Sequence, residues 1–151
     1  MIIADGPARE GSSTGTNELS SLSPRAAEIG HHHNVADQYP CPCCGHLTLA
    51  SGGCYDLCPV CFWEDDPNQL ERPLSTDGAN GKSLVDSQQA YVQIAAMDKI
   101  FSSKVRAAHQ DEPRDNGWRP IDPQLDLAAD GTQPAGTRTQ YSSLYWWKRH
   151  H

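Results

Sequence analysis

Two short cysteine motifs, Cys41-Pro42-Cys43-Cys44-Gly45 and Cys58-Pro59-Val60-Cys61, decide how this 151-residue chain is interpreted. Each contains a C-x-x-C pair, and thirteen residues separate the first pair from the second. Two such pairs at this spacing supply the four thiolates of a tetrahedral metal site. Proline at the second position presets φ for a tight turn, and the glycine after the first pair permits a positive φ. The predicted ligands of one zinc ion are Cys41, Cys44, Cys58 and Cys61, and iron is an alternative that the same donors accept.

Cys43 and Cys54 are the two remaining cysteines. Cys43 lies between two predicted ligands and cannot easily share their metal. We interpret it as a small buried residue, or alternatively as an auxiliary, redox-sensitive thiol. Cys54 is expected on one side of a hairpin. The N-terminus has neither the basic start nor the apolar stretch of a signal peptide, so we expect a cytoplasmic protein in which disulfides are disfavoured. No apolar run approaches the roughly 20 residues that a membrane span requires.

The segment between the two cysteine pairs has the pattern of a β-hairpin. Residues 46–49 and 54–57 alternate like strands on either side of Ser51-Gly52-Gly53, which is typical of a tight turn. The sequence therefore predicts a zinc ribbon, in which a hairpin joins two metal-binding turns.

One helix is predicted after the cysteine motifs. Ser83 and Asp86 have the spacing of a capping box, and Pro113 predicts an end by about residue 110. An apolar stripe follows the cap at helical spacing and predicts a single packed face. Its members are Tyr91, Ile94, Met97, Phe101 and Val105. We expect Phe62 and Trp63 to pack against this stripe and complete the core.

Composition divides the chain into three parts. Leu, Ile, Val and Phe together make up about 16% of the residues, and mean hydropathy is −0.64, so a core should occupy only part of the chain. Residues 1–36 are expected to form a disordered N-terminal tail, and residues 37–119 the zinc-binding domain. Residues 120–151 are expected to be an extended segment that ends in aromatic and basic residues and either docks on the domain or meets a partner.

Charge is unevenly distributed in a chain whose net charge is −7. Residues 41–71 hold five acidic residues and no Lys or Arg. A basic protein partner is therefore expected at the acidic turn, and nucleic acid is disfavoured there because phosphate binding needs clustered cations. The candidate partner-binding face consists of exposed carboxylates at Glu64, Asp65 and Asp66 with Trp63 beside them. The leading interpretation is a non-enzymatic protein-interaction or adaptor module with a structural tetrathiolate zinc, because four protein thiolates leave no open position for a substrate.

Two other function classes stay open on the sequence alone. A metal-dependent enzyme would place a second cation on the carboxylates of the acidic turn. A ribosome- or nucleic-acid-associated zinc ribbon would use the cations of the last third of the chain. These cations are Lys104, Arg106, Arg114, Arg119 and those of the Tyr145–Arg149 end.

The motifs resemble the cysteine-rich CPCC family of small, mostly bacterial proteins. The resemblance rests on Tyr39-Pro40-Cys41-Pro42-Cys43-Cys44-Gly45, on Tyr55-Asp56, on residues 58–66 and on Gly78-Ala79-Asn80-Gly81. It implies a small α+β fold with a zinc-ribbon hairpin and one packed α-helix; the flexible tails that composition predicts on either side lie outside the resemblance. Because the family has no established activity, the resemblance predicts the fold and not the function. Cys54 departs from the family pattern, and so does Asp86-Ser87-Gln88, where Glu-Ala-Arg is typical.

Overall fold

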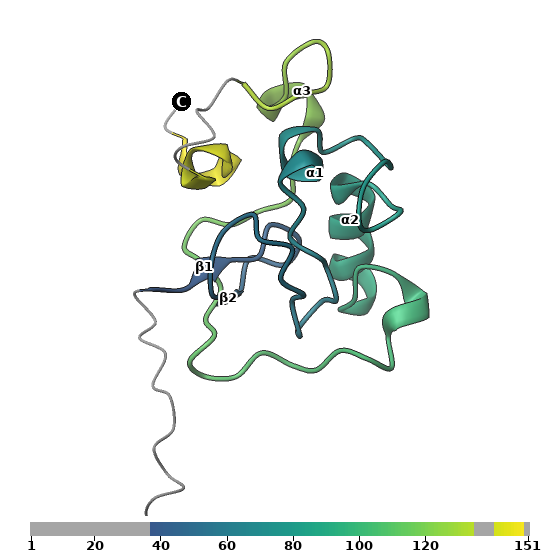
Figure 1. Cartoon of the computed structure of the whole chain (residues 1–151), viewed down its shortest axis with the longest axis vertical. Helices are drawn as coiled ribbons and strands as arrows, with labels where there is room; N and C mark the ends of the chain where they lie inside the picture. Colours follow the sequence, from purple (N-terminus) through teal and green to yellow (C-terminus); the bar gives the residue numbers. More distant parts are fainter. Residues whose placement is uncertain (1–36, 135–140, 150–151) are drawn as a thin grey trace, which may run out of the picture. The chain divides into compact units, whose positions relative to one another are not determined.

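The computed structural model describes residues 37–134 and 141–149 (Figure 1). The predicted tail, residues 1–36, lies outside them. The described chain has two strands and six short helices. They are β1 (Tyr39–Pro40), β2 (Leu47–Leu49), α1 (Pro67–Glu71), α2 (Leu84–Ile94), the 3-10 helix η4 (Lys99–Phe101), α3 (Pro123–Asp126), and the 3-10 helices η5 (Tyr141–Leu144) and η6 (Trp146–Lys148). A small α+β fold with an antiparallel hairpin is therefore confirmed.

The hairpin differs from the predicted one. β1 pairs antiparallel with β2, in the register Tyr39 to Leu49, so the first cysteine motif itself forms the connection. The segment before Cys58 pairs across the second motif instead: the Tyr55 N–H donates to the Asp65 carbonyl, and the Asp65 N–H donates to the Asp56 carbonyl. The expected hairpin between residues 46–49 and 54–57 is wrong, because each cysteine turn closes on its own flanking residues.

α1 begins at the acidic turn. Asp66 is its N-cap and accepts a hydrogen bond from the Asn68 N–H at 2.8 Å, and Pro67 occupies the first helical position. Both residue types favour helix starts, since the carboxylate satisfies a free N–H and proline presets φ. The same Asp66 carboxylate also accepts from the Ala79 N–H at 3.0 Å, so it joins α1 to the loop before α2.

α2 begins where the capping pattern predicts and ends earlier. The Ser83 hydroxyl accepts from the Asp86 N–H at 3.0 Å and donates to the Asp86 carboxylate at 2.9 Å. The helix stops at Ala95, whose φ of 59° is left-handed. The predicted continuation to residue 110 is wrong. The Met97 N–H instead donates to the Cys61 carbonyl, a contact that a continuing helix would not allow.

The apolar stripe is thus divided between elements. Met97 is buried, while Ile94 is exposed. Phe101 lies in η4 and stacks on Phe62 with ring centroids 4.3 Å apart, so the expected packing of Phe62 on the stripe is made by η4. On α2 itself the buried residues are Leu84, Ser87 and Gln88.

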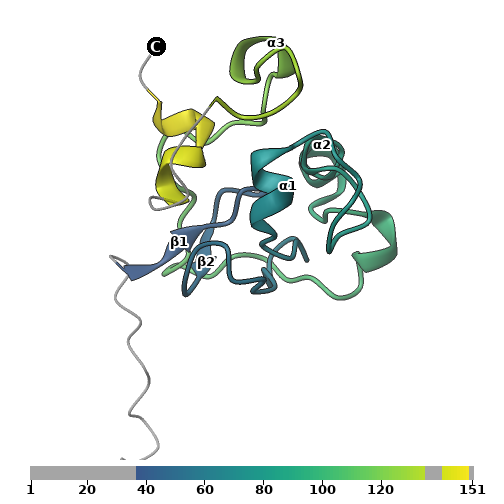
Figure 2. The same cartoon turned by 45° about the horizontal axis from the view of Figure 1, so that its top comes forward.

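The aromatic C-terminal end docks on the domain. Leu144, Tyr145 and Trp146 are buried in the same core as the cysteines. The Tyr145 hydroxyl donates to the Pro40 carbonyl at 3.0 Å, which fixes η5 and η6 near β1 (Figure 2). Of the two alternatives left open by the sequence, the structure therefore shows docking. Within the described residues, no helix is both long and apolar enough to cross a membrane.

Candidate metal centre

The two C-x-x-C motifs fold into matching turns. The Gly45 N–H donates to the Cys41 carbonyl at 2.7 Å, and the Phe62 N–H donates to the Cys58 carbonyl at 2.8 Å. Both residues after the pairs have positive φ, 81° for Gly45 and 75° for Phe62. The predicted left-handed turn is therefore present twice, although only the first turn uses glycine.

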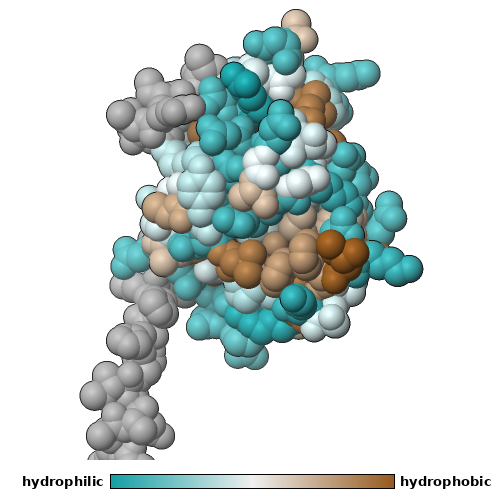
Figure 3. Space-filling model, turned by 45° about the vertical axis from the view of Figure 1, so that its right-hand side comes forward, coloured by the Kyte–Doolittle hydropathy of each residue, from teal (hydrophilic) through white to brown (hydrophobic). Residues whose placement is uncertain are grey.

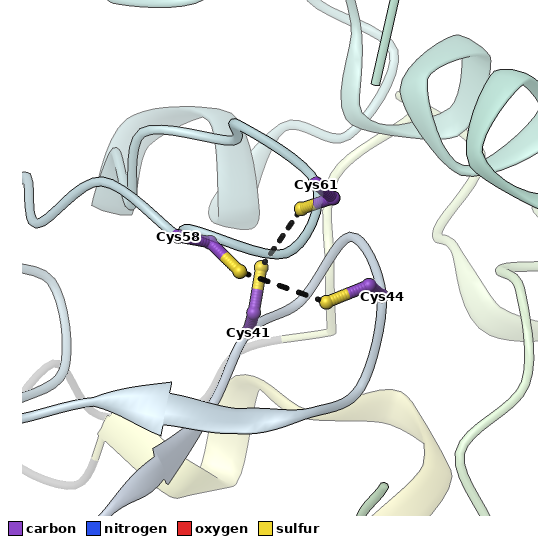
Figure 4. Close-up of side chains that lie close together, drawn as sticks. All are labelled: Cys41, Cys44, Cys58 and Cys61. Carbon is purple, nitrogen blue, oxygen red and sulfur yellow. Dashed lines mark hydrogen bonds between the residues drawn. The ribbon is translucent and has the colours of Figure 1, made fainter. Parts of the chain in front are cut away.

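These turns bring four sulfur atoms together (Figure 4). The Sγ atoms of Cys41, Cys44, Cys58 and Cys61 all lie within 4.8 Å of one another, and all four side chains are fully buried. Cys41 and Cys61 approach to 3.6 Å, and Cys44 and Cys58 to 3.7 Å, so each close contact joins one turn to the other. Among the described residues, this is the only group of three or more metal-binding side chains.

The two short sulfur–sulfur distances fit tetrahedral coordination of one metal ion. With Zn–S bonds of about 2.3 Å, the edge of a regular tetrahedron is about 3.8 Å, close to the two short distances. The donor set is four thiols, which zinc and iron both accept. The four predicted ligands therefore lie close enough together to hold one metal ion.

Burial makes the uncharged thiol the preferred form when no cation is bound. It raises the pKa of Cys41, Cys44 and Cys61 well above the usual range for a thiol. Cys58 differs, because hydrogen bonds from Cys41, Cys44 and Cys61 lower its pKa, and Thr48 adds a hydroxyl donor 3.2 Å from its sulfur. A bound cation would supply the charge that four thiolates need in this environment.

Neither remaining cysteine joins the four sulfurs. Cys43 is fully buried, which fits the interpretation as a small buried residue and removes the access that a redox-sensitive thiol requires. Cys54 is exposed, and its thiol donates to the Gly52 carbonyl at 3.7 Å.

The acidic turn is not the exposed face that the sequence suggested. Trp63 and Asp65 are fully buried, Asp66 is 2% exposed, and only Glu64 is half-buried. Backbone donors occupy the carboxylates: Asp65 accepts from the Gly53 N–H at 2.7 Å, and Asp66 caps α1. The expectation of an exposed carboxylate surface is wrong, because these side chains satisfy local N–H groups. Binding of a basic partner stays a prediction, now without that surface to support it.

Residues 113–118 pack against the first cysteine turn, although no sequence motif in this segment predicts that contact. The Leu47 N–H donates to the Pro113 carbonyl at 3.0 Å, and His46 forms an isolated antiparallel bridge with Arg114. The Trp118 ring covers Gly45 so closely that a Cβ there would lie 2.5 Å from it. The only sequence signal is the glycine itself, which does not specify which side chain lies above it.

Gln88 is a second residue that sequence reasoning missed. Its amide donates to the Pro42 carbonyl at 2.9 Å and accepts from the Ile121 N–H at 2.8 Å. This buried side chain of α2 joins the first cysteine turn to the segment after Trp118. A helical glutamine is ordinarily solvated, so the pattern did not distinguish it.

Fold and site together define a small α+β protein with a buried four-cysteine centre. Residues 39–112 match the model of the family described as Cysteine-rich CPCC. This segment therefore belongs to the cysteine-rich CPCC family, as its motifs predicted. A search of curated proteins found no match to the chain.

Proposed function

We propose that this protein is a structural zinc protein in which Cys41, Cys44, Cys58 and Cys61 hold one Zn²⁺ as thiolates. The observation that carries the proposal is the convergence of four fully buried sulfurs within 4.8 Å of one another, with the two contacts between the turns close to the edge of a zinc tetrahedron. Four protein donors complete the coordination of zinc, so the ion would stabilise the fold and leave no position for a substrate. Zinc is favoured over iron by general metal availability.

We further propose that the domain serves to bind another protein and is not an enzyme. The closed donor set supports this role, and so does the burial of the carboxylates that a second catalytic cation would need. One face, on the side of α2 and η4, carries a hydrophobic patch (Figure 3). Val92 and Ile100 are 61% and 72% exposed. Exposed apolar groups of this kind are typical of interaction surfaces.

Ion pairs in the structure weaken the alternative that this protein binds nucleic acid. Arg106 forms two hydrogen bonds with the Glu112 carboxylate, at 2.7 and 2.8 Å. Arg119 binds Asp126 in the same way at the same two distances. Two of the candidate cations are therefore already paired with carboxylates, which weakens the cluster of free cations that counterion release from phosphates requires.

The metal proposal is tested by elemental analysis of the reduced full chain. We expect one zinc per chain, and Cys44→Ser should abolish stoichiometric binding. Binding should also supply much of the folding free energy, on the order of 10 kcal/mol for structural zinc. Cys54→Ser is the matched control, since this exposed cysteine lies outside the centre and its replacement should leave one zinc bound. Wild-type protein without metal, or with iron, would contradict the proposal.

The interaction role is tested separately. Proteins retained from the native cytosol by the zinc-loaded chain would be purified, and their direct binding measured by calorimetry. We expect at least one purified protein to bind the wild type and not the metal-free Cys44→Ser variant. If none binds directly, the interaction role is wrong even where the metal analysis succeeds.

A further inference from the structure

An occupied centre would carry a charge that its own segment cannot offset. Four thiolates and one Zn²⁺ sum to −2, and all four cysteines are fully buried. Residues 41–71 contain no Lys or Arg. A buried net charge is costly unless a cation or aligned donors face it. The segment supplies a donor, the Thr48 hydroxyl 3.2 Å from the Cys58 sulfur, so only a compensating cation has to come from another part of the chain.

The chain brings Arg114 to the first cysteine turn. Its backbone is held there on both sides: the Leu47 N–H donates to the Pro113 carbonyl at 3.0 Å, and the Asp115 N–H donates to the Gly45 carbonyl at 2.7 Å. These bonds place Arg114 opposite His46, two residues after Cys44. Its position thus depends on the turn that presents two of the sulfurs.

The guanidinium group is also fixed. Nε donates to the carbonyl of Cys44 at 3.1 Å, and Nη2 donates to the Tyr91 hydroxyl at 3.3 Å. Its central carbon lies 5.0 Å from the centre of the Trp118 ring and 5.8 Å from that of Tyr91, which are cation–π distances. Trp118 is itself held by its indole N–H, which donates to the Pro42 carbonyl at 3.2 Å.

Arg114 differs from Arg106 and Arg119 because no carboxylate in the described part of the chain pairs with it. Arg106 is paired with Glu112, and Arg119 with Asp126. Within residues 37–134 and 141–149, no ion pair is found for Arg114. Arg114 is an exposed residue, but aromatic rings and the carbonyl of Cys44 hold its guanidinium against the first cysteine turn. Among the described residues no carboxylate offsets its charge.

We propose that Arg114 is a positioning residue of the metal centre, which offsets the negative charge of the four thiolates and holds Cys44 in its ligand geometry. The proposal rests on the proposed function, since it requires an occupied centre. Partners behind metal ligands commonly contribute 10- to 100-fold to metal affinity. Arg114 lies outside residues 39–112, so this contribution would be added to the family domain by the following segment.

Two substitutions separate charge from packing. Arg114→Gln keeps an N–H donor and removes the charge, whereas Arg114→Lys keeps the charge and loses the planar fork. Arg72→Gln, at the exposed C-terminal end of α1, is the matched control for loss of one positive charge. Zinc affinity of each full-length chain would be measured by chelator competition at neutral pH.

We expect Arg114→Gln to weaken zinc binding by about 10-fold, Arg114→Lys to restore most of the affinity, and Arg72→Gln to match wild type. The loss in Arg114→Gln should shrink near 1 M salt, where the screening length falls to about 3 Å, because a packing defect would not respond to salt. Equal affinity of wild type and Arg114→Gln would overturn the proposal, as would equal losses in both Arg114 variants. A wild-type chain that binds no zinc would instead contradict the proposed function itself.

Discussion

Asp65 is a buried carboxylate whose pKa the fold shifts toward neutral pH. Burial raises its pKa to about 6, while hydrogen bonds from the Tyr141 hydroxyl and the Gly53 N–H act in the opposite direction. The folded chain thus holds this proton more tightly than the unfolded chain. The stabilisation from protonation is fully present below about pH 4 and is lost as the pH rises through about 6.

We expect the Asp65 carboxyl to titrate near pH 6 in the zinc-loaded protein, followed by NMR of its side-chain carbon. Tyr141→Phe removes a donor to the carboxylate, so the pKa of Asp65 should rise further. Tyr55→Phe is the control, because it removes the hydroxyl of an exposed tyrosine. A titration near pH 4 in the wild type, or an unchanged midpoint in Tyr141→Phe, would show that Asp65 is not balanced between burial and these bonds.

At the scale of elements, local patterns were predicted well and their pairing was not. The capping pattern at Ser83, the glycine turn at Gly45 and the two cysteine turns that bring four sulfurs together each depend on residues a few positions apart, so the sequence contains their signal. The pairing of β1 with β2 depends on hydrogen bonds inside the first cysteine turn. The alternation of residues 46–57 contains no information on which segments pair. The predicted hairpin is wrong for this reason.

The end of α2 was also predicted wrongly, again because a hydrogen bond to a distant part of the chain decides it. The apolar stripe continues to Val105 at helical spacing, yet the chain leaves the helix at Ala95 so that the Met97 N–H can reach the Cys61 carbonyl. A contact across 36 positions outweighs the local propensity for helix. The same applies to Arg114 at the centre, because no local pattern relates it to Cys44.

The left-handed conformation of Ala95 makes a paired prediction possible. An L-residue with a side chain is strained by about 1 kcal/mol at such a φ, and glycine is not. Ala95→Gly should therefore raise the free energy of unfolding by roughly 0.5 to 1 kcal/mol. Ala90→Gly, inside α2, should lower it by about 1 kcal/mol, because glycine is a poor helix former.

Both variants would be unfolded with denaturant at one fixed free zinc concentration, since metal binding contributes to stability. Opposite signs for the same substitution are expected only if the helix ends where the structure places its end. Destabilisation by both would indicate that Ala95 is helical and that α2 continues as the stripe suggested.

At the scale of the whole molecule, the core extends beyond the family domain. Residues 39–112 match the family, yet Leu144, Tyr145 and Trp146 share one core cluster with the cysteines. Their polar atoms are also satisfied by the body of the protein: the Trp146 indole donates to the Arg119 carbonyl at 2.8 Å. Aromatic residues at a chain end could equally serve a partner, so composition alone left the choice open.

Trp146 tests whether the C-terminal segment is part of the folded unit. Its ring is fully buried and packs edge-on against Trp147, with ring centroids 4.6 Å apart. Trp146→Ala should therefore lower the free energy of unfolding by about 3 to 5 kcal/mol at fixed free zinc. Leu125→Ala, at a side chain that is 71% exposed, should change it by about 0.5 kcal/mol or less. Zinc stoichiometry should stay at one in both folded variants, because neither residue supplies a ligand. A loss in Trp146→Ala as small as in the control would mean that η5 and η6 lie on the domain without stabilising it, and that the family domain holds its centre alone.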